Sequence, residues 1–311
     1  MPLSQNQLLH FQHEGYVIIE NALTSNDLDP VIGGINRFID EKARALDQEN
    51  LISDLYKNEP FDHRLALITG ENTSIYDQID IMHMRSEALF HFLGNTRLLD
   101  LVETIVGPEI TCNPIQHLRA KLPDHTSDGS KNSSPALTTR IKENVAPWHQ
   151  DAQVHLEDAD PVSILTVWLP LVDTDEANGC LQVMPQVHRE NIVYWSEEFG
   201  IDDNHLPKRE VLSLPMKKND VLLMHKLLPH RSLPNRSQAI RWSLDLRYQQ
   251  TGLPTGRSYY PNFITRSQRH PEFVLTDYQT WARGWVQALN ITTQRPARKN
   301  RPTKPTPITL F

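Results

Sequence analysis

The sequence predicts a mainly β fold, a sandwich or a barrel, with flanking helices. Three observations predict this fold class. Short segments rich in β-branched and apolar residues follow one another through the middle of the chain. Turn signals such as Asn178-Gly179 separate these segments. Helical periodicity, in contrast, is concentrated before residue 110 and after Asp277.

The helices are expected mainly in the first 109 residues. Ser25-Asn-Asp is a helix cap, and Pro30 lies early enough in the helix that follows to be tolerated. Gly107-Pro108 is a typical helix end. We expect helices at 4–14, 25–39, 86–92 and 96–105, a strand at 15–20, an irregular segment with short helices at 47–80, and a late helix capped by Asp277.

The strands are expected from residue 110 onward. Residues 124–146 hold few apolar side chains, which is typical of a disordered segment or a lid. The basic, proline-rich residues 295–307 predict an extended and poorly ordered tail. We expect extended segments at 110–121, 163–169, 180–184, 212–215, 221–224 and 242–248, within one domain that has a helical part (1–109), a β core (110–250) and a C-terminal part (251–311).

The composition is ordinary for a globular protein and argues against several classes. The 311 residues are 39% hydrophobic and 22% charged, and the formal net charge of −7 disfavours a nucleic-acid partner. Two cysteines, Cys112 and Cys180, are too few for a disulfide framework. Neither a signal peptide nor a membrane-spanning apolar run is recognisable. We therefore expect a cytoplasmic monomer or homodimer with no membrane partner.

Trp148-His149-Gln150-Asp151 contains a candidate metal-binding pair. On a strand, side chains two residues apart point to the same face, so His149 and Asp151 are expected to converge. Imidazole nitrogen with one carboxylate oxygen suits Fe(II), and two histidines with one carboxylate form the facial triad of non-haem iron oxygenases. Alone, the pair also fits an ordinary histidine beside a solvated acid.

A second histidine and an arginine extend the pair. His225 lies in an apolar run where a core histidine is expected, whereas His230 follows a turn and precedes the strand that begins at Arg241. An oxygenase that uses 2-oxoglutarate needs a cation for the distal carboxylate of this co-substrate, and the planar fork of arginine provides it. Ser243 shares the strand face of Arg241 and can add a hydrogen bond.

The sequence resembles the phytanoyl-CoA dioxygenase family of Fe(II)- and 2-oxoglutarate-dependent oxygenases. The segments that carry the resemblance are Gly15-Tyr-Val-Ile-Ile, Gly107-Pro108, Trp148-His-Gln-Asp151, Trp168-Leu-Pro-Leu171, Asn178-Gly-Cys-Leu181 with Pro185 and His188, His230-Arg-Ser-Leu-Pro-Asn235 with Arg241, and Leu244-Asp-Leu-Arg-Tyr248.

The resemblance implies a double-stranded β-helix (jelly-roll, cupin-like) core and two cofactors. It implies iron at His149, Asp151 and His230, with 2-oxoglutarate held by Arg241. Trp168 and Ser232 match further 2-oxoglutarate pocket positions. Another pocket position falls on His117, where the chain departs from the family: histidine replaces an apolar residue, and Leu122 replaces the first proline of a Lys-Pro-Pro-like turn.

The implied reaction is oxidation of an unactivated C–H bond of a small organic substrate by O2, with release of succinate and CO2, in secondary or small-molecule metabolism. Asp151 stands where related halogenases have a small residue, so hydroxylation, desaturation or ring closure is favoured over halogenation. The alternative is a metal-binding barrel without redox chemistry, an isomerase, a hydrolase or a binding module, against which Arg241 and Ser243 argue. Activity is expected to fall below about pH 6.5, where histidines protonate.

Two other histidines are expected to be structural, and one aromatic pair is left open. His155 is predicted on a surface loop and His188 beside a turn. Tyr259 and Tyr260 are expected either at the mouth of the pocket or at a packed edge of the barrel.

Overall fold

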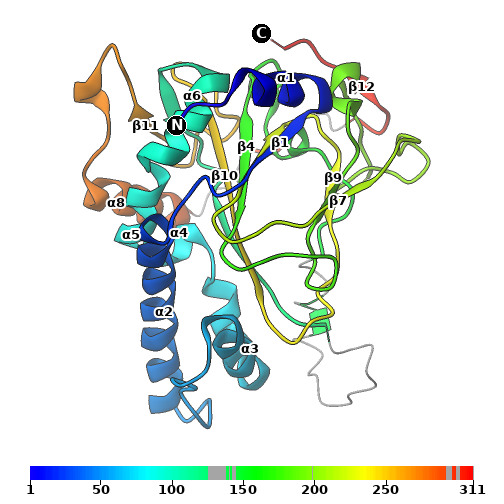
Figure 1. The fold of residues 1–311 in the computed structure, drawn as a ribbon. Coiled ribbons are helices and arrows are strands. Elements are labelled where there is room, and N and C mark those ends of the chain that lie inside the picture. The colour runs from blue at the N-terminus through cyan, green and yellow to red at the C-terminus, as the bar shows by residue number, and fades with distance from the viewer. Residues whose placement is uncertain are drawn as a thin grey trace.

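A computed structural model of the chain separates a layer of helices from a pair of β sheets (Figure 1). It describes residues 1–124, 138–139, 141, 145–197, 199–291, 296–298 and 302–310. The helices α2, α3, α5, α6 and α8 lie on one side of the largest sheet in Figure 1. Most of the polar segment predicted at 124–146, and part of the tail predicted at 295–307, lie outside the described residues.

The helices begin at side-chain caps and bury one face. Ser4 and Gln7 form a capping box at α1, and the carboxylate of Asp277 accepts two backbone N–H groups at the start of α8. The helices are α1 (Gln5–Glu14), α2 (Ser25–Gln48), α3 (Phe61–Glu71), α4 (Ile81–Met84), α5 (Glu87–Leu93), α6 (Thr96–Val106) and α8 (Tyr278–Asn290).

Two details of the helical layer differ from expectation. The cap of α2 is Thr24, whose hydroxyl and N–H pair with Asp27, one residue before the predicted Ser25. Residues 47–80, predicted to be irregular with short helices, contain the helix α3, which at eleven residues is longer than that prediction suggests. The periodicity of α3 is weak because Arg64 occupies a buried position, where its guanidinium donates to Asp40 and to the carbonyl oxygen of Leu55.

The strands form a large and a small antiparallel sheet, which confirms the predicted double-stranded β-helix class. The large sheet has the order β1-β8-β4-β10-β2-β11, with β3 also paired to β10, and the small sheet has the order β7-β5-β9. The strands are β1 (Tyr16–Ile19), β2 (Ile110–Cys112), β3 (His117–Lys121), β4 (Leu165–Pro170), β5 (Leu181–Val183), β6 (Ile192–Val193), β7 (Leu212–Leu214), β8 (Val221–His225), β9 (His230–Ser232), β10 (Arg241–Gln250), β11 (Phe263–Arg266) and β12 (Thr306–Pro307).

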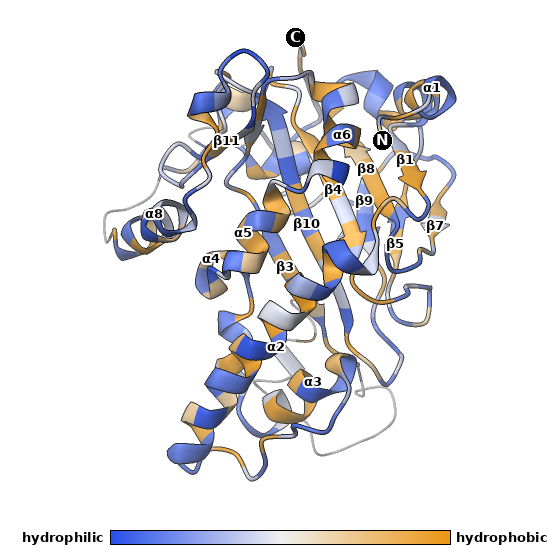
Figure 2. Ribbon diagram, turned by 60° about the vertical axis from the view of Figure 1, so that its left-hand side comes forward, coloured by the Kyte–Doolittle hydropathy of each residue, from blue (hydrophilic) through white to orange (hydrophobic). Residues whose placement is uncertain are grey.

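The pleat of β10 divides its residues between the core and the space between the sheets. Trp242, Leu244, Leu246 and Tyr248 belong to the main core beside the helices. Alternate residues point the other way, and hydrophilic and hydrophobic residues accordingly alternate along this strand (Figure 2). Register carries the pattern to neighbouring strands, where Lys121 of β3 faces Arg241 and Thr166 of β4 faces Arg247. The hydrophilic face of β10 therefore lies between the two sheets.

The described part of the tail is ordered, so its prediction as a poorly ordered strap is wrong there. Strand β12 pairs with β6, and Ile308 and Leu310 pack against a small apolar cluster that includes Ala152 and Trp195. Arg298 donates to both carboxylate oxygens of Asp160 at 2.9 and 2.6 Å. Within the described residues, no helix is long and apolar enough to cross a membrane.

Candidate metal centre and its cavity

Two histidines face each other across a bridge between distant segments. His149 and His230 form an antiparallel β-bridge, in which each backbone N–H donates to the carbonyl oxygen of the other residue, at 3.0 and 2.9 Å. Directly opposed residues of such a pair point to the same face. The centroids of the two imidazole rings lie 4.1 Å apart. The bridge therefore brings both rings to one point between the sheets.

Asp151 completes a cluster with these histidines. Its Oδ1 lies 4.0 Å from Nε2 of His149 and 3.9 Å from Nε2 of His230. The candidate ligand atoms of the three buried residues all lie within 4.8 Å of one another. The strand geometry predicted for the pair is wrong, because the chain leaves the bridge after His149 and Asp151 begins the 3₁₀ helix η3 (Asp151–Val154). The side chains converge all the same.

Backbone carbonyl groups determine which nitrogen of each histidine faces the cluster. Nδ1 of His149 lies 2.8 Å from the carbonyl oxygen of Pro147, and Nδ1 of His230 lies 3.0 Å from that of Leu228. A carbonyl oxygen only accepts, so these contacts assign the proton to Nδ1 and leave the lone pair of Nε2 free. This is the tautomer that a metal-ligating histidine requires.

The carboxylate of Asp151 is held by two further residues. Arg247 donates to Oδ1 at 2.6 Å, and the hydroxyl of Thr166 donates to Oδ2. Burial alone would raise the pKa of Asp151, but Arg247 and the two histidines outweigh it and hold this pKa well below the usual range. Sequence reasoning missed Arg247 and Thr166, although the alternation along β10 places Arg247 on the same strand face as Arg241.

The donor set fits iron. Burial, followed by the nearby His230, lowers the pKa of His149 to about 4, so its ring is neutral well below the pH of about 6.5 at which we expected activity to fall. Two neutral imidazole nitrogens and one ionised carboxylate oxygen are the donors of a facial triad, which suits Fe(II) and leaves further coordination positions open. The cluster can therefore hold iron without rearrangement of its charges.

A buried cationic end lies along the same face of β10. Arg241 is 3% exposed and Lys121 is 1% exposed, and they are directly opposed in the register of β10 and β3. Burial, with the neighbouring Arg241, lowers the pKa of Lys121 to about 6, and burial lowers that of Arg241 to about 10. Nε of Arg241 has no hydrogen-bond partner among the described residues. A buried guanidinium with an orphaned donor, beside an amine whose charged form a carboxylate favours, fits one end of a bound dicarboxylate.

The other predicted pocket residues surround this cationic end. Ser243 accepts a hydrogen bond from Nη1 of Arg241, and the ring of Trp168 lies 5.5 Å from the guanidinium carbon. The hydroxyl of Ser232 accepts from Nζ of Lys121 at 2.7 Å. From the sequence, Lys121 was considered as part of a Lys-Leu-Pro turn and of a basic entrance but not as a 2-oxoglutarate residue, and its position on the inward face of β3 is the signal that could have identified it.

His117 lines the same cavity, but its hydrogen-bond partner, Asp80, does not. Its Nδ1 lies 2.8 Å from Oδ2 of Asp80, whose other oxygen accepts the backbone N–H of Leu118. Burial raises the pKa of Asp80, but His117 and Arg119 outweigh it and keep this pKa low. His117 thus lines the wall as a partner of Asp80, and its predicted contact with 2-oxoglutarate stays a prediction.

A cavity of about 410 Å³ joins the metal cluster to the cationic end. Its wall includes the three cluster residues, Trp168, Ser232, Arg241 and His117. Tyr260 lines it too, while its ring also packs 5.3 Å from that of Trp285, so both roles considered for this tyrosine hold. A larger hollow of about 660 Å³ lies between α2 and α5 and contains none of the cluster residues. The candidate metal ligands and Arg241 therefore line the 410 Å³ cavity and not the larger hollow.

His155, His188 and His225 lie outside the cluster and pack against other parts of the fold, but the predicted surface position of His155 is wrong. His155 is 2% exposed and lies beneath the loop after β10, where its Nδ1 is 3.2 Å from the carbonyl oxygen of Thr255, so it is not on a surface loop. His188 and His225 pack against each other with ring centroids 5.1 Å apart. Gln153 donates to the carbonyl oxygens of Tyr194 and Gly200.

Comparison with known proteins assigns the family. The family model described as "Phytanoyl-CoA dioxygenase (PhyH)" matches residues 11–243. The chain belongs to the phytanoyl-CoA dioxygenase family. A probable phytanoyl-CoA dioxygenase of Caenorhabditis elegans is 25% identical over 267 residues, which is 81% of this chain and 77% of that protein.

Two solved structures share the fold. EctD from S. alaskensis, determined with 2-oxoglutarate and 5-hydroxyectoine, is 19% identical over 81% of this chain and 77% of its own, with a TM-score of 0.56. The epimerase SnoN, in complex with Fe³⁺, α-ketoglutarate and nogalamycin RO, is 15% identical over 82% of this chain and 88% of its own, with a TM-score of 0.54. Family, fold and cluster together identify the broad class as an iron- and 2-oxoglutarate-dependent oxygenase.

Proposed function

We propose that the protein hydroxylates an unactivated C–H bond of a small organic substrate. The single observation that carries this proposal is one cavity with a His-Asp-His cluster at one point and a buried, unneutralised arginine at another. When bound there, iron and 2-oxoglutarate supply the oxidant: one oxygen atom of O2 enters succinate as 2-oxoglutarate loses CO2, and the other becomes the hydroxyl group of the product.

The metal ligands in this proposal are His149, Asp151 and His230. Their donor atoms already lie within 4.8 Å of one another, and the Nδ1 contacts to backbone carbonyl oxygens orient both rings. Arg247 and Thr166 restrict rotation of the Asp151 carboxylate. The protein thus holds the three donors in place before metal arrives, which reduces the reorganisation that binding requires.

The 2-oxoglutarate residues in this proposal are Arg241 and Lys121, with support from Ser243, Ser232 and Trp168. Arg241 offers a planar fork to the distal carboxylate, and Ser243 orients the guanidinium by accepting from Nη1. Lys121 now donates to the hydroxyl of Ser232 and to the carbonyl oxygen of Leu233 at 2.6 Å.

The substrate would lie against apolar side chains beside the cluster. The ring of Phe199 lies 4.9 Å from that of His149, and Phe199 is 45% exposed. Leu181, Met224 and Val154 line other parts of the same wall. These groups can orient a C–H bond and exclude water, while the chain itself provides no acid or base for the bond-breaking step.

The alternative, a metal barrel without redox chemistry, leaves the cationic end unexplained. A hydrolase or isomerase that uses only the metal has no need for a buried arginine at the other end of the cavity, and burying Arg241 without a carboxylate partner among the described residues is costly. The SnoN structure is that of an epimerase, so the same fold also serves an outcome other than hydroxylation. Product analysis is therefore part of the test.

The test measures 2-oxoglutarate turnover and metal binding in the same protein. Purified protein with Fe(II) and ascorbate is expected to release succinate from 2-oxoglutarate in amounts that rise with a substrate and fall to background in His149→Ala. The control is His188→Ala, a histidine outside the cluster. In anaerobic protein, Fe(II) and 2-oxoglutarate should produce a visible charge-transfer band. Turnover of the His149→Ala variant equal to the wild type, or absence of both signals, contradicts the proposal.

A further inference from the structure

The cavity wall carries more positive charge than the two cofactors need. Among the described residues it includes five arginines, Arg119, Arg231, Arg241, Arg247 and Arg257, but only two carboxylates, Asp151 and Asp245. A divalent iron and a doubly charged 2-oxoglutarate cancel each other, so cofactor binding leaves this excess unchanged. The chain as a whole has a net charge of −7, which makes the local excess a property of the cavity.

Four of these arginines have partners or a place outside the substrate space. Arg247 pairs with Asp151, and Arg241 belongs to the proposed 2-oxoglutarate end. Arg231 donates to Oε1 of Gln182 at 2.8 Å and stacks 4.8 Å above the ring of Trp148. Arg119 is directly opposite Ser243 in the register of β3 and β10, and this register places Arg119 at the cationic end. Its charge also lowers the pKa of Asp80.

Arg257 is the arginine that remains. Its Nη1 donates to the hydroxyl of Tyr259, a neutral acceptor, and it forms no ion pair with a carboxylate among the described residues. It follows the end of β10 that is nearer to Arg247 than to Arg241, and its neighbour Gly256 contacts His155 and Leu156, a few residues after Asp151. A substrate beside the cluster, displaced from the 2-oxoglutarate end, therefore approaches Arg257.

The backbone around Arg257 is fixed to the segment that carries the metal ligands. The N–H of Leu156 donates to the carbonyl oxygen of Gly256 at 3.2 Å. Gly256 has a φ of +67°, and a Cβ there would lie 2.8 Å from Cβ of His155, so only glycine allows this close approach. The backbone N–H of Tyr260 donates to the carbonyl oxygen of Arg257 at 2.9 Å, which closes the turn between them.

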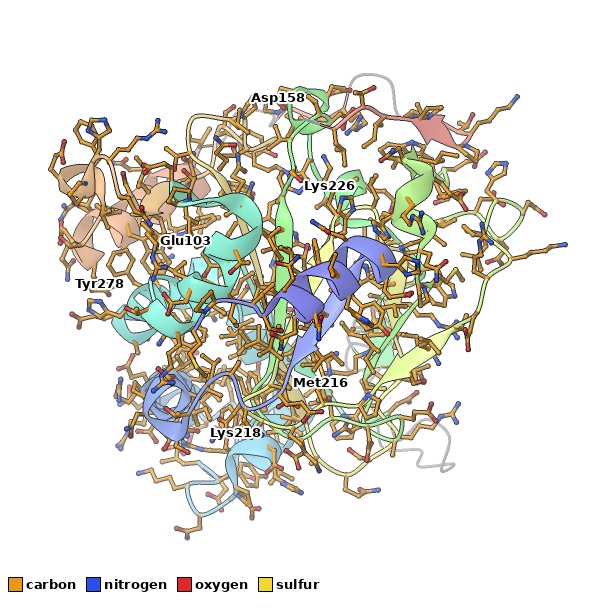
Figure 3. The ribbon with its side chains drawn as sticks, turned by 45° about the horizontal axis from the view of Figure 1, so that its top comes forward. Glu103, Asp158, Met216, Lys218, Lys226 and Tyr278 are labelled. Atoms are coloured by element: carbon orange, nitrogen blue, oxygen red, sulfur yellow. The ribbon has the colours of Figure 1, made fainter. Side chains whose placement is uncertain are left out.

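Hydrogen bonds from two other parts of the chain also hold the segment from Asp151 to Asp160 in place. Lys226, which is labelled with Asp158 in Figure 3, donates to the carbonyl oxygens of Ala159 at 3.1 Å and Asp160 at 2.6 Å. Arg298 of the tail holds the carboxylate of Asp160. The backbone at Arg257 is thus connected to the segment after Asp151 through backbone hydrogen bonds, which positions the base of the arginine side chain relative to the metal cluster.

We propose that Arg257 binds an anionic group of the substrate, and that the substrate is an organic acid with an apolar body. The inference rests on the proposed function and specifies its substrate class. Arg231 and Arg257 both lack a carboxylate partner among the described residues, but Arg231 is held by Gln182 and by the ring of Trp148, whereas the guanidinium of Arg257 is held only by its near neighbour Tyr259. Phe199, Val154 and Met224 provide the apolar surface for the body of the molecule.

The experiment compares carboxylic acids with their uncharged amides. Protein loaded with Ni(II) and N-oxalylglycine, which occupy the two cofactor positions without turnover, is titrated with hexanoate against hexanamide and with phenylacetate against phenylacetamide. Calorimetry is expected to show that each acid binds at least about tenfold more tightly than its amide, because a charge-assisted pair is lost in the amide. In Arg257→Gln this preference is expected to disappear.

Controls separate this inference from the proposed function. Arg269→Gln removes the same charge from an exposed arginine that does not line the cavity, and it should keep the preference for acids. Arg257→Gln should still bind N-oxalylglycine, and Arg257→Lys should restore part of the preference. If N-oxalylglycine fails to bind the wild type, the proposed function is contradicted, and the acid and amide titrations are then made without it.

Two outcomes overturn the inference itself. One is a wild type with no preference for acids, including the case in which neither member of a pair binds. The other is an Arg257→Gln variant that folds, as judged by its circular dichroism, and keeps the full preference. Either outcome leaves succinate release from 2-oxoglutarate untouched, so the failure of the substrate class remains distinguishable from failure of the oxygenase assignment.

Discussion

Strand β10 contributes one arginine to each end of the cavity, Arg247 at the metal end and Arg241 at the cationic end, but the protein satisfies the charges of the two ends differently. At the metal end, Asp151 receives hydrogen bonds from Arg247 and Thr166, and each histidine donates to a backbone carbonyl group. At the cationic end, Arg241 and Lys121 are buried beside each other without an ion pair to a carboxylate among the described residues. At the metal end the polar groups are hydrogen-bonded within the protein, whereas at the cationic end Nε of Arg241 has no partner among the described residues.

This difference indicates where folding stability and where ligand affinity reside. A buried ion pair that loses one partner leaves an uncompensated charge, whereas removing an unpaired buried charge relieves a desolvation cost. Arginine substitutions at the two ends should therefore have opposite effects on the free energy of unfolding. Three measurements test or refine that contrast.

The largest effect is expected from Arg247→Ala. It leaves the carboxylate of Asp151 buried and without its ion-pair partner, which should cost about 3–5 kcal/mol of unfolding free energy in urea titrations. Arg283→Ala is the matched control, since Arg283 pairs with Asp277 at 3.5 Å on the surface with 64% of its side chain exposed. The control should lose less than about 1 kcal/mol. Equal losses in the two variants would contradict the asymmetry.

A smaller effect, on binding alone, is expected from Arg241→Met. The Kd for 2-oxoglutarate should rise about tenfold to a hundredfold, since a charge-assisted hydrogen bond contributes about 1.5–3 kcal/mol. The unfolding free energy of the ligand-free protein should stay the same or increase, because an unpaired buried charge is removed. Calorimetry and urea titration of the same preparation measure both. A loss of stability comparable to that of Arg247→Ala would show that the cationic end is already satisfied.

The smallest effect is the uptake of a proton by the protein when 2-oxoglutarate binds. Burial lowers the pKa of Lys121 to about 6, so this amine is mostly neutral at pH 7.5 in the free protein. A bound carboxylate favours the charged form and raises the pKa, so up to one proton should be taken up on binding. Calorimetry in phosphate and in Tris, with Ni(II) present, measures the uptake from the difference in apparent enthalpy. Lys121→Met should abolish the difference, and a wild type without it would contradict the low pKa.

The sequence allowed much of this arrangement to be predicted, and the failures have physical causes. His149, Asp151 and His230 were predicted together, and the structure brings them together, because a spaced pair and a later histidine on a β framework leave few alternatives. Arg247 and Lys121 were missed, since only register shows that these side chains point to the inner face. The predicted strand at Asp151 was wrong, because a bridge of one residue pair has no sequence pattern of its own.

Long-range contacts explain the other differences. His155 was expected on the surface, but its cover comes from the loop at Thr255 and Gly256, a hundred residues away, which no local pattern reveals. The tail was expected to be poorly ordered from its charge and prolines, yet its described part gains order by pairing β12 with β6. A sandwich or barrel, in contrast, follows from many short strands separated by turn signals, whereas the double-stranded β-helix was predicted only from the resemblance to the family.

The continuity of β10 has a consequence for how this kind of site can diversify. Arg241 and Arg247 are six positions apart on an unbroken strand, which separates their Cα atoms by about 20 Å at about 3.4 Å per residue. In the function that we propose, Arg241 holds the co-substrate, so this strand sets its separation from the partner of Asp151 independently of the loops. Under the same proposal, substitutions around Arg257 would change the oxidised molecule and leave that separation unchanged.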